Sequence, residues 1–160
     1  MKTWHYTGMV TLLMLLDLGL SPRQGQAAMV KLSLEQLATR ADTIVLGTVT
    51  RQTSAWNAQH TAIYTEVTVA VEQVIMGASG AEVTLRIAGG VVGEIAMRSS
   101  NHPVFQDDER VIVFLDTRQV PASLVGLYQG KYSVSDGAVT WDEKTLPLEV
   151  FIEAIRTAVR

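Results

Sequence analysis

A long stretch of alternating side chains over residues 63–75 constrains the fold more than any other feature of the chain. One side of the extended backbone carries Ile63, Thr65, Val67, Val69, Val71, Gln73 and Ile75, and the other carries Tyr64, Glu66, Thr68, Ala70 and Glu72. This period-two alternation is typical of a β-strand with one buried face. At roughly 3.3 Å per residue the strand would span about 43 Å. A strand of this length must coil or bend in a small domain, so we predict that it serves both halves of a small barrel or sandwich.

Helices are predicted at the two ends of the folded part. The Ser33 hydroxyl can accept an amide proton from the residue three positions on, a glutamine whose side chain can reach back to the Ser33 amide. This capping box predicts a short helix to about Arg40. A second helix is predicted to begin at Thr145 and to cover 146–159, with Pro147 tolerated in its first turn.

Short apolar or alternating segments between these helices predict further strands. They lie at residues 43–50, 82–87, 91–97, 110–115, 124–128, 131–134 and 138–141. The segment 110–115 is apolar after its arginine, which predicts a strand buried on both faces. Gly47 indicates a bulge or a close backbone contact in its strand. We read the polar residues 51–61 as a loop, and Gly89–Gly93 as a bend or bulge where barrel strands cross rather than as a nucleotide loop.

About seven antiparallel strands with a helix at each end predict a mainly β fold. The expected architecture is a small OB-like antiparallel barrel with a short N-terminal helix and a C-terminal helix. A β-sandwich is the alternative.

The N-terminus has the pattern of an export signal. Lys2 supplies a positive charge, residues 9–16 form an apolar run, and Gly25 to Ala27 offers a small-x-small cleavage site, with cleavage after Ala28 a near alternative. The run is shorter than the roughly 20 apolar residues that span a bilayer. We predict a signal peptide over residues 1–28 and a single domain over 29–160, exported to the periplasm or outside the cell. An uncleaved N-terminal anchor is the alternative.

Cysteine content and charge limit the class of partner. The chain has no cysteine, so the small disulfide-stapled secreted classes are excluded. Loss of Lys2, Arg23 and Asp17 with the leader changes the formal charge from −3 to −4. A mildly acidic domain without a Lys/Arg cluster is a poor binder of nucleic acid or of an anionic membrane. A protein partner in the cell envelope or outside the cell is therefore the favoured partner.

Several local motifs carry a resemblance to known domains. They lie at residues 41–49, 63–67, 74–77, 89–90, 108–115 and 129–132. Across residues 33–160 the chain resembles a group of exported bacterial domains of unassigned function, which occur alone or ahead of a metalloprotease-like or surface-anchoring segment. Across residues 41–90, the order of an Ala-Asp-x-Ile-Val-x-Gly motif, a long strand and a turn glycine is similar to the netrin-like OB-fold module of tissue inhibitors of metalloproteinases.

The resemblance implies an OB-like fold and an exported setting. It transfers no functional residue, because those inhibitors place the amine and carbonyl of an N-terminal cysteine on the protease zinc. This chain has no cysteine.

A possible recognition patch combines aromatic, basic and amide side chains around a glycine bend. Its residues are Trp56, Arg98, His102, Gln129, Lys131 and Tyr132. Trp, Tyr and Arg are enriched among binding hot spots. In the alternative interpretation Tyr132 fills the core and Lys131 is solvated. Trp141 is expected to pack beside the C-terminal helix rather than to bind sugar.

Catalytic and metal-binding interpretations centre on residues 98–109. The candidate groups are Ser99, Ser100, His102, Asp107 and Asp108, with His60 as a second possible zinc ligand. A hydrolase needs a nucleophile, a base and an orienting acid, but the chain has no Gly-x-Ser-x-Gly elbow. The sequence Asp107-Asp108-Glu109 lacks the spacing that wraps calcium. The favoured interpretation of this segment is a solvated loop, with no metal and no cofactor.

These observations favour an exported, non-enzymatic β-barrel domain that acts as a protein-interaction module. A small exported hydrolase or metal-dependent enzyme that uses the 98–109 loop is one alternative. A carbohydrate-binding OB-like module is the other.

Overall fold

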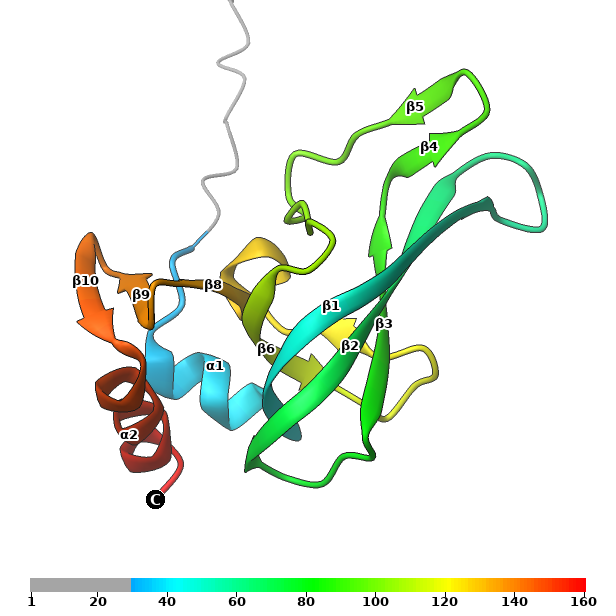
Figure 1. Ribbon diagram of the computed structural model, residues 1–160. Helices are drawn as coiled ribbons and strands as arrows, with labels where there is room; N and C mark the ends of the chain where they lie inside the picture. The colour runs from blue at the N-terminus through cyan, green and yellow to red at the C-terminus, as the bar shows by residue number, and fades with distance from the viewer. Residues whose placement is uncertain (1–29) are drawn as a thin grey trace, which may run out of the picture. The chain divides into compact units, whose positions relative to one another are not determined.

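The computed structural model describes residues 30–160, and the predicted signal peptide over 1–28 lies outside the described residues (Figure 1). The helices are α1 (Leu34–Arg40), the 3₁₀ helix η1 (Leu127–Gly130) and α2 (Leu148–Ala158). The strands are β1 (Thr43–Trp56), β2 (Ile63–Met76), β3 (Glu82–Ala88), β4 (Gly90–Val92), β5 (Ile95–Met97), β6 (Arg110–Asp116), β7 (Ser123–Leu124), β8 (Lys131–Ser135), β9 (Ala138–Trp141) and β10 (Lys144–Pro147). The fold is therefore mainly β, with one helix before the strands and one after them, as the sequence predicts. Across residues 30–160, no helix has the length and apolar character that a membrane crossing requires.

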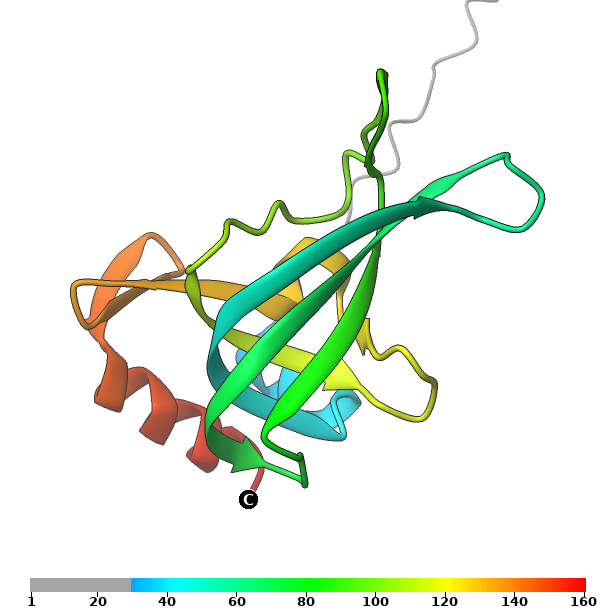
Figure 2. The ribbon, with the colours of Figure 1, turned by 45° about the vertical axis from the view of Figure 1, so that its right-hand side comes forward.

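Five strands form a ring. β1 pairs antiparallel with β2 and with β6, β2 pairs with β3, and β6 pairs with β7. A parallel bridge between Leu85 of β3 and Ala122, just before β7, closes the circuit. There the Arg86 amide donates to the Ala122 carbonyl at 2.8 Å, and the Ala122 amide donates to the Thr84 carbonyl at 3.0 Å. Figure 2 shows the twist of β1, β2 and β3 that this closure requires. The result is a small barrel-like ring, which is consistent with the OB-like architecture expected from the pattern of strands and helices.

The interior of the ring is filled mainly by branched aliphatic side chains. The buried residues of this cluster are Val45, Val49, Val67, Val69, Leu85, Ile87, Phe105, Val111, Val113, Leu115, Ala122 and Leu124. Gly47 lies in β1 where its register against β2 shifts, so the predicted bulge is confirmed. A Cβ on Gly47 would lie 2.2 Å from the Ala70 carbonyl oxygen. The absence of a side chain at this position lets β1 and β2 approach each other as they coil.

A second apolar cluster lies outside the ring, beneath α1 and α2. It contains buried side chains from α1, β1, β6 and α2, including Leu37, Ile44, Phe114, Phe151 and Ile155. Alternate residues of β6 enter the two clusters, so the prediction that this strand is buried on both faces is confirmed. The capping box at Ser33 is formed as predicted, and α1 ends at Arg40.

Two corrections concern the segments beside the long strand. The predicted loop over 51–61 is wrong, because β1 continues to Trp56 and pairs with the first half of β2. From Thr50 to Trp56 every side chain of β1 is exposed or partly exposed, so polar residues are compatible with a strand there. The single strand predicted over 91–97 is a hairpin, in which β4 and β5 are joined through Gly93.

The bend at Gly89–Gly90 explains how β4 departs from β3. Both residues have positive φ, 99° and 142°. A Cβ on Gly90 would lie 2.4 Å from the Ser54 and Thr65 hydroxyl oxygens. The Thr65 hydroxyl donates to the Gly89 carbonyl at 2.8 Å. At this glycine pair the chain bends and passes close over the β1–β2 ribbon, so the predicted bend is confirmed.

The C-terminal third differs from the prediction in two places. The segment predicted as strands over 124–128 and 131–134 contains β7, the 3₁₀ helix η1 and β8. The C-terminal helix begins at Leu148 rather than at Thr145, because β10 occupies 144–147 and pairs with β9 through a turn at Asp142 and Glu143. Pro147 precedes the helix as its N-cap residue. A turn at Asp136 and Gly137, with φ values of 51° and 71°, joins β8 to β9.

Candidate functional site

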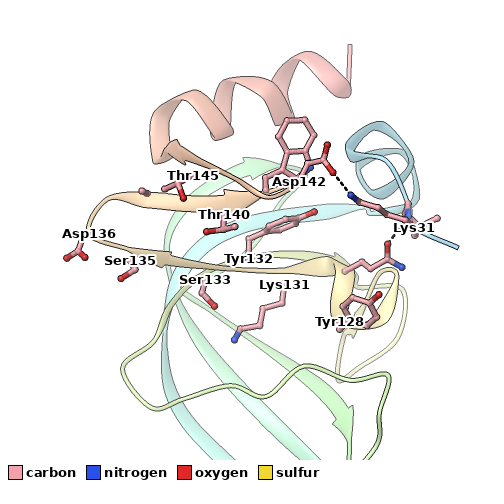
Figure 3. A pocket seen from close by; sticks show the side chains of 14 residues that line it. Lys31, Tyr128, Lys131, Tyr132, Ser133, Ser135, Asp136, Thr140, Asp142 and Thr145 are labelled. Atoms are coloured by element: carbon pink, nitrogen blue, oxygen red, sulfur yellow. Dashed lines mark hydrogen bonds and ion pairs between the residues drawn. The ribbon is translucent and has the colours of Figure 1, made fainter. Parts of the chain in front are cut away.

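A groove opens where β8 and β9 separate. The two strands pair only at Val134 with Val139 and at Ser135 with Ala138, next to their connecting turn. Beyond that point β8 follows β6, whereas β9 follows β10. The groove between them has a volume of about 760 Å³ (Figure 3). It is lined by Lys31, Leu32, Tyr128, Gln129, Lys131, Tyr132, Ser133, Ser135, Asp136, Ala138, Thr140, Trp141, Asp142 and Thr145.

Aromatic rings form the side of the groove that faces α2. The Tyr132 ring centre lies 4.9 Å from that of Phe151 and 5.7 Å from that of Phe114. The Trp141 ring centre lies 6.0 Å from that of Phe151. Trp141 therefore packs beside the C-terminal helix, as the sequence predicts, and it also lines the groove. Burial raises the pKa of Tyr132 to about 12, so its hydroxyl is protonated at neutral pH.

The segment before α1 closes one end of the groove. Lys31 forms an ion pair with Asp142 in the β9–β10 turn, and Figure 3 shows the two side chains meeting. The Leu32 amide donates to the Gln129 side-chain oxygen at 2.7 Å. Hydrogen bonding and Coulomb attraction raise the pKa of Lys31 and lower that of Asp142. Residues far apart in the chain thereby build a single wall.

The Lys131 ammonium is directed to the opposite side, toward the 98–109 loop (Figure 3). It donates to Glu109 at 2.6 Å and to the Val104 carbonyl at 2.7 Å, and it lies 4.8 Å from the ring centre of Phe105. Ser133 also donates to Glu109, at 2.5 Å. Partial burial of Glu109 opposes its ionisation, but hydrogen bonds from Lys131 and Ser133 outweigh that effect and lower the pKa of Glu109. This cluster fixes the 98–109 loop to β8.

The six residues of the predicted patch do not all share one surface. Gln129, Lys131 and Tyr132 meet in the groove. Trp56 lies at the end of the β1–β2 ribbon, where its ring stacks on that of His60 with centres 6.0 Å apart. Arg98 follows β5. His102 lines a separate, smaller hollow beside β2 and β3.

The candidate catalytic residues make ordinary loop contacts. Ser99 Oγ and His102 Nδ1 are 2.8 Å apart within one turn of the chain. Asp107 accepts from the Gln52 side chain at 2.8 Å. Asp108 has a φ of 60° at a turn. In residues 30–160, no group of three or more His, Cys, Asp or Glu side chains gathers as a metal site would require.

Sequence reasoning missed the far wall of the groove, formed by Thr140, Asp142 and Thr145. One local signal was available there. The pair Asp142-Glu143, between alternating residues 138–141 and 144–147, can form a two-residue hairpin turn. Neither residue is glycine, which is why the turn was not recognised.

No known protein family matches this chain, and no curated protein sequence matches it either. A functional proposal for the chain therefore rests on its own residues.

Proposed function

We propose that this chain is an exported, non-enzymatic binding module that holds an extended peptide segment of another protein in the groove between β8 and β9. The observation that supports the proposal is the early end of the β8–β9 ladder after two residue pairs. The strand edges that diverge there border a groove with an aromatic side and polar walls. Backbone edges of this kind bind extended peptides by strand addition, while the adjacent side chains select the sequence.

The charges of the groove favour a segment with little net charge. Its two lysines already have carboxylate partners, Lys31 with Asp142 and Lys131 with Glu109. The remaining polar lining consists mainly of hydroxyl and amide groups. A strongly acidic segment would lose its hydration without gaining an unpaired cation, and a strongly basic segment would meet only one unpaired carboxylate among these lining residues, that of Asp136, which is exposed at the β8–β9 turn. We therefore expect a neutral segment with at least one apolar or aromatic side chain.

The aromatic residues are the expected main contributors to affinity. Tyr132 and Trp141 are supported from behind by Phe151, so they offer rigid surfaces. Tyr128 is 48% exposed at the edge of the groove. Binding energy is usually concentrated in a few Tyr, Trp and Arg side chains at the centre of an interface.

A peptide-display selection tests this proposal. The purified exported protein is used to enrich peptides from a random library, and the dissociation constant of an enriched peptide is then measured by titration calorimetry. Tyr128→Ala is expected to weaken binding by about tenfold or more. Trp56→Ala is the control, because Trp56 is also a partly exposed aromatic residue, but it lies at the end of the β1–β2 ribbon and lines neither the groove nor the smaller hollow beside β2 and β3. Equal affinities of both variants and the parent, or failure to enrich any peptide, would rule out the groove as a peptide site.

A second candidate function is carbohydrate binding, which one specific feature favours. The groove combines tyrosine and tryptophan rings with the hydroxyls of Ser133, Ser135, Thr140 and Thr145. Aromatic faces and hydroxyl groups are also what a neutral sugar requires. A glycan array probed with the same protein distinguishes the two functions. Binding of a glycan that Tyr128→Ala removes, without any enriched peptide, would replace the peptide proposal with this one.

The exported setting rests on the leader pattern in the sequence. An intact-mass measurement of the protein recovered from outside the cytoplasm of a bacterial host tests it. A mature start near Ala28 or Met29 is the expected result. A mass that includes the first 28 residues would contradict cleavage and favour the anchor.

A further inference from the structure

A second hollow lies on the outer surface of the barrel, away from the β8–β9 groove. It has a volume of about 190 Å³ and lies between the β2–β3 surface, the loop that carries His102, and the segment before β7. Its lining residues are Tyr64, Arg86, Ala88, His102, Gln119, Val120, Pro121, Ala122 and Ser123. This volume is smaller than the sites of about 300–1,000 Å³ that hold drug-sized ligands. It suits a ligand group of a few atoms.

The hollow is rich in hydrogen-bond donors. Arg86 contacts Glu66 through Nη2 at 2.6 Å, on the adjacent strand. A guanidinium carries five N–H groups, so this contact leaves others for a ligand. The Arg86 side chain remains 47% exposed beside the hollow.

His102 supplies a second nitrogen group from a different segment. Its Nδ1 is held by Ser99 Oγ at 2.8 Å, which orients the imidazole ring. When Nδ1 accepts the serine hydroxyl proton, the remaining proton of a neutral imidazole is on Nε2. On the side formed by the segment before β7, the Gln119 side chain donates to the Ser123 hydroxyl at 3.0 Å, which holds both side chains in place.

The lining chemistry selects an anion. Among the described residues that line the hollow, none is aspartate or glutamate, whereas arginine, histidine, tyrosine and glutamine are all present. Glu66 balances part of the Arg86 charge from outside the lining. A guanidinium fork binds planar carboxylates through two parallel N–H bonds. We propose that this hollow binds a carboxylate group on a small ligand, with Arg86 as the main anchor and His102 as the second donor.

Two sources can supply this group: a free small carboxylic acid, or the C-terminal carboxylate of a peptide. NMR titration of the ¹⁵N-labelled exported protein distinguishes them. The probes are sodium acetate, sodium succinate, acetyl-trialanine as the free acid and acetyl-trialanine amide, each against sodium chloride of equal ionic strength. Saturable shifts around Arg86 and His102 are expected with the carboxylates and not with the amide. Tighter binding of the tripeptide acid than of acetate would identify a peptide C-terminus, and the reverse would identify a free acid.

A matched pair of arginine variants tests the anchor. Arg86→Gln is expected to weaken carboxylate binding by about tenfold or more, as expected when a hydrogen bond to a charged group is lost. Arg110→Gln is the control, because Arg110 also pairs with a glutamate on β2, Glu72 at 2.7 Å, at similar exposure, but does not line the hollow. His102→Asn is expected to weaken binding by a smaller factor, about threefold.

Three results would overturn the proposal. The first is the absence of shifts near Arg86 in the folded parent protein at high acetate concentration. The second is equal weakening by Arg86→Gln and Arg110→Gln, which would indicate a general charge effect. The third is binding of inorganic phosphate but of no carboxylate, which would assign a different ligand class.

Discussion

Replacement of Lys131 by methionine is expected to destabilise the domain by about 2–4 kcal/mol at pH 7. Lys131 and Glu109 form the most enclosed ion pair in residues 30–160, with side chains only 9% and 15% exposed. Removal of one partner from a buried pair costs about 3–5 kcal/mol, because the other charge stays buried without compensation. The expected loss is slightly smaller, since Glu109 retains hydrogen bonds from Ser133 and from the Gln106 amide. Methionine keeps an unbranched apolar side chain of similar length, but it also removes the contact of the ammonium with the Phe105 ring and its hydrogen bond to the Val104 carbonyl.

The penalty should depend on pH in a defined direction. The pKa of Glu109 is lowered in the folded protein, so its ionised form stabilises the fold above the ordinary carboxyl pKa of about 4.3. That contribution is lost as the pH falls through the lowered folded-state pKa. In Lys131→Met the carboxylate is buried without its cation, so the variant gains from protonation on acidification. The stability difference between parent and variant is therefore expected to be largest near pH 7 and to shrink below about pH 4.

Urea unfolding at pH 7 and at about pH 3, followed by circular dichroism, measures both effects. Arg118→Met is the control, because it breaks an ion pair with Asp116 in which the arginine side chain is 77% exposed, and a much smaller change in stability is expected. Glu109→Gln and the double variant complete a cycle that isolates the pair. A Lys131→Met penalty no larger than that of Arg118→Met, or a penalty equal at both pH values, would refute the reasoning.

Three further predictions test other parts of the structure. Ser33→Ala is expected to cost about 1 kcal/mol, because it removes the hydrogen-bonded cap of α1; an unchanged urea midpoint would contradict this. Gly47→Ala is expected to lower the free energy of unfolding by about 3 kcal/mol, because its Cβ would lie 2.2 Å from the Ala70 carbonyl oxygen. Gly80→Ala is the control in the same urea assay. It should be nearly neutral, because the nearest atom to its Cβ would be the Glu82 carbonyl oxygen at 3.8 Å. Tyr132 is expected to ionise near pH 12, since burial raises its pKa to about that value; an NMR titration of its ring that centres near pH 10 would show that the ring is solvated.

The alternating segment 63–75 and the apolar segment 110–115 supported the barrel prediction. A strand buried on one face alternates apolar and polar residues, and a strand buried on both faces is apolar throughout, so the sequence shows both kinds of burial directly. The cap at Ser33, the bulge at Gly47 and the bend at Gly89–Gly90 could also be predicted from the sequence, because each depends on a local steric or hydrogen-bonding requirement. The continuation of β1 to Trp56 was not readable, because the side chains of β1 from Thr50 onward are exposed or partly exposed on both faces and show no apolar period.

The sequence by itself determined which segments are buried and where most of the chain turns. Only the tertiary structure decided that β8 separates from β9 after two residue pairs and that Lys31 reaches across to Asp142. It also decided that His102 lies beside Arg86 rather than beside Tyr132. The physical reason is the separation in sequence between the residues that determine each feature. Caps, turns and alternation depend on neighbours a few residues apart, whereas a groove depends on where strands distant in sequence stop pairing.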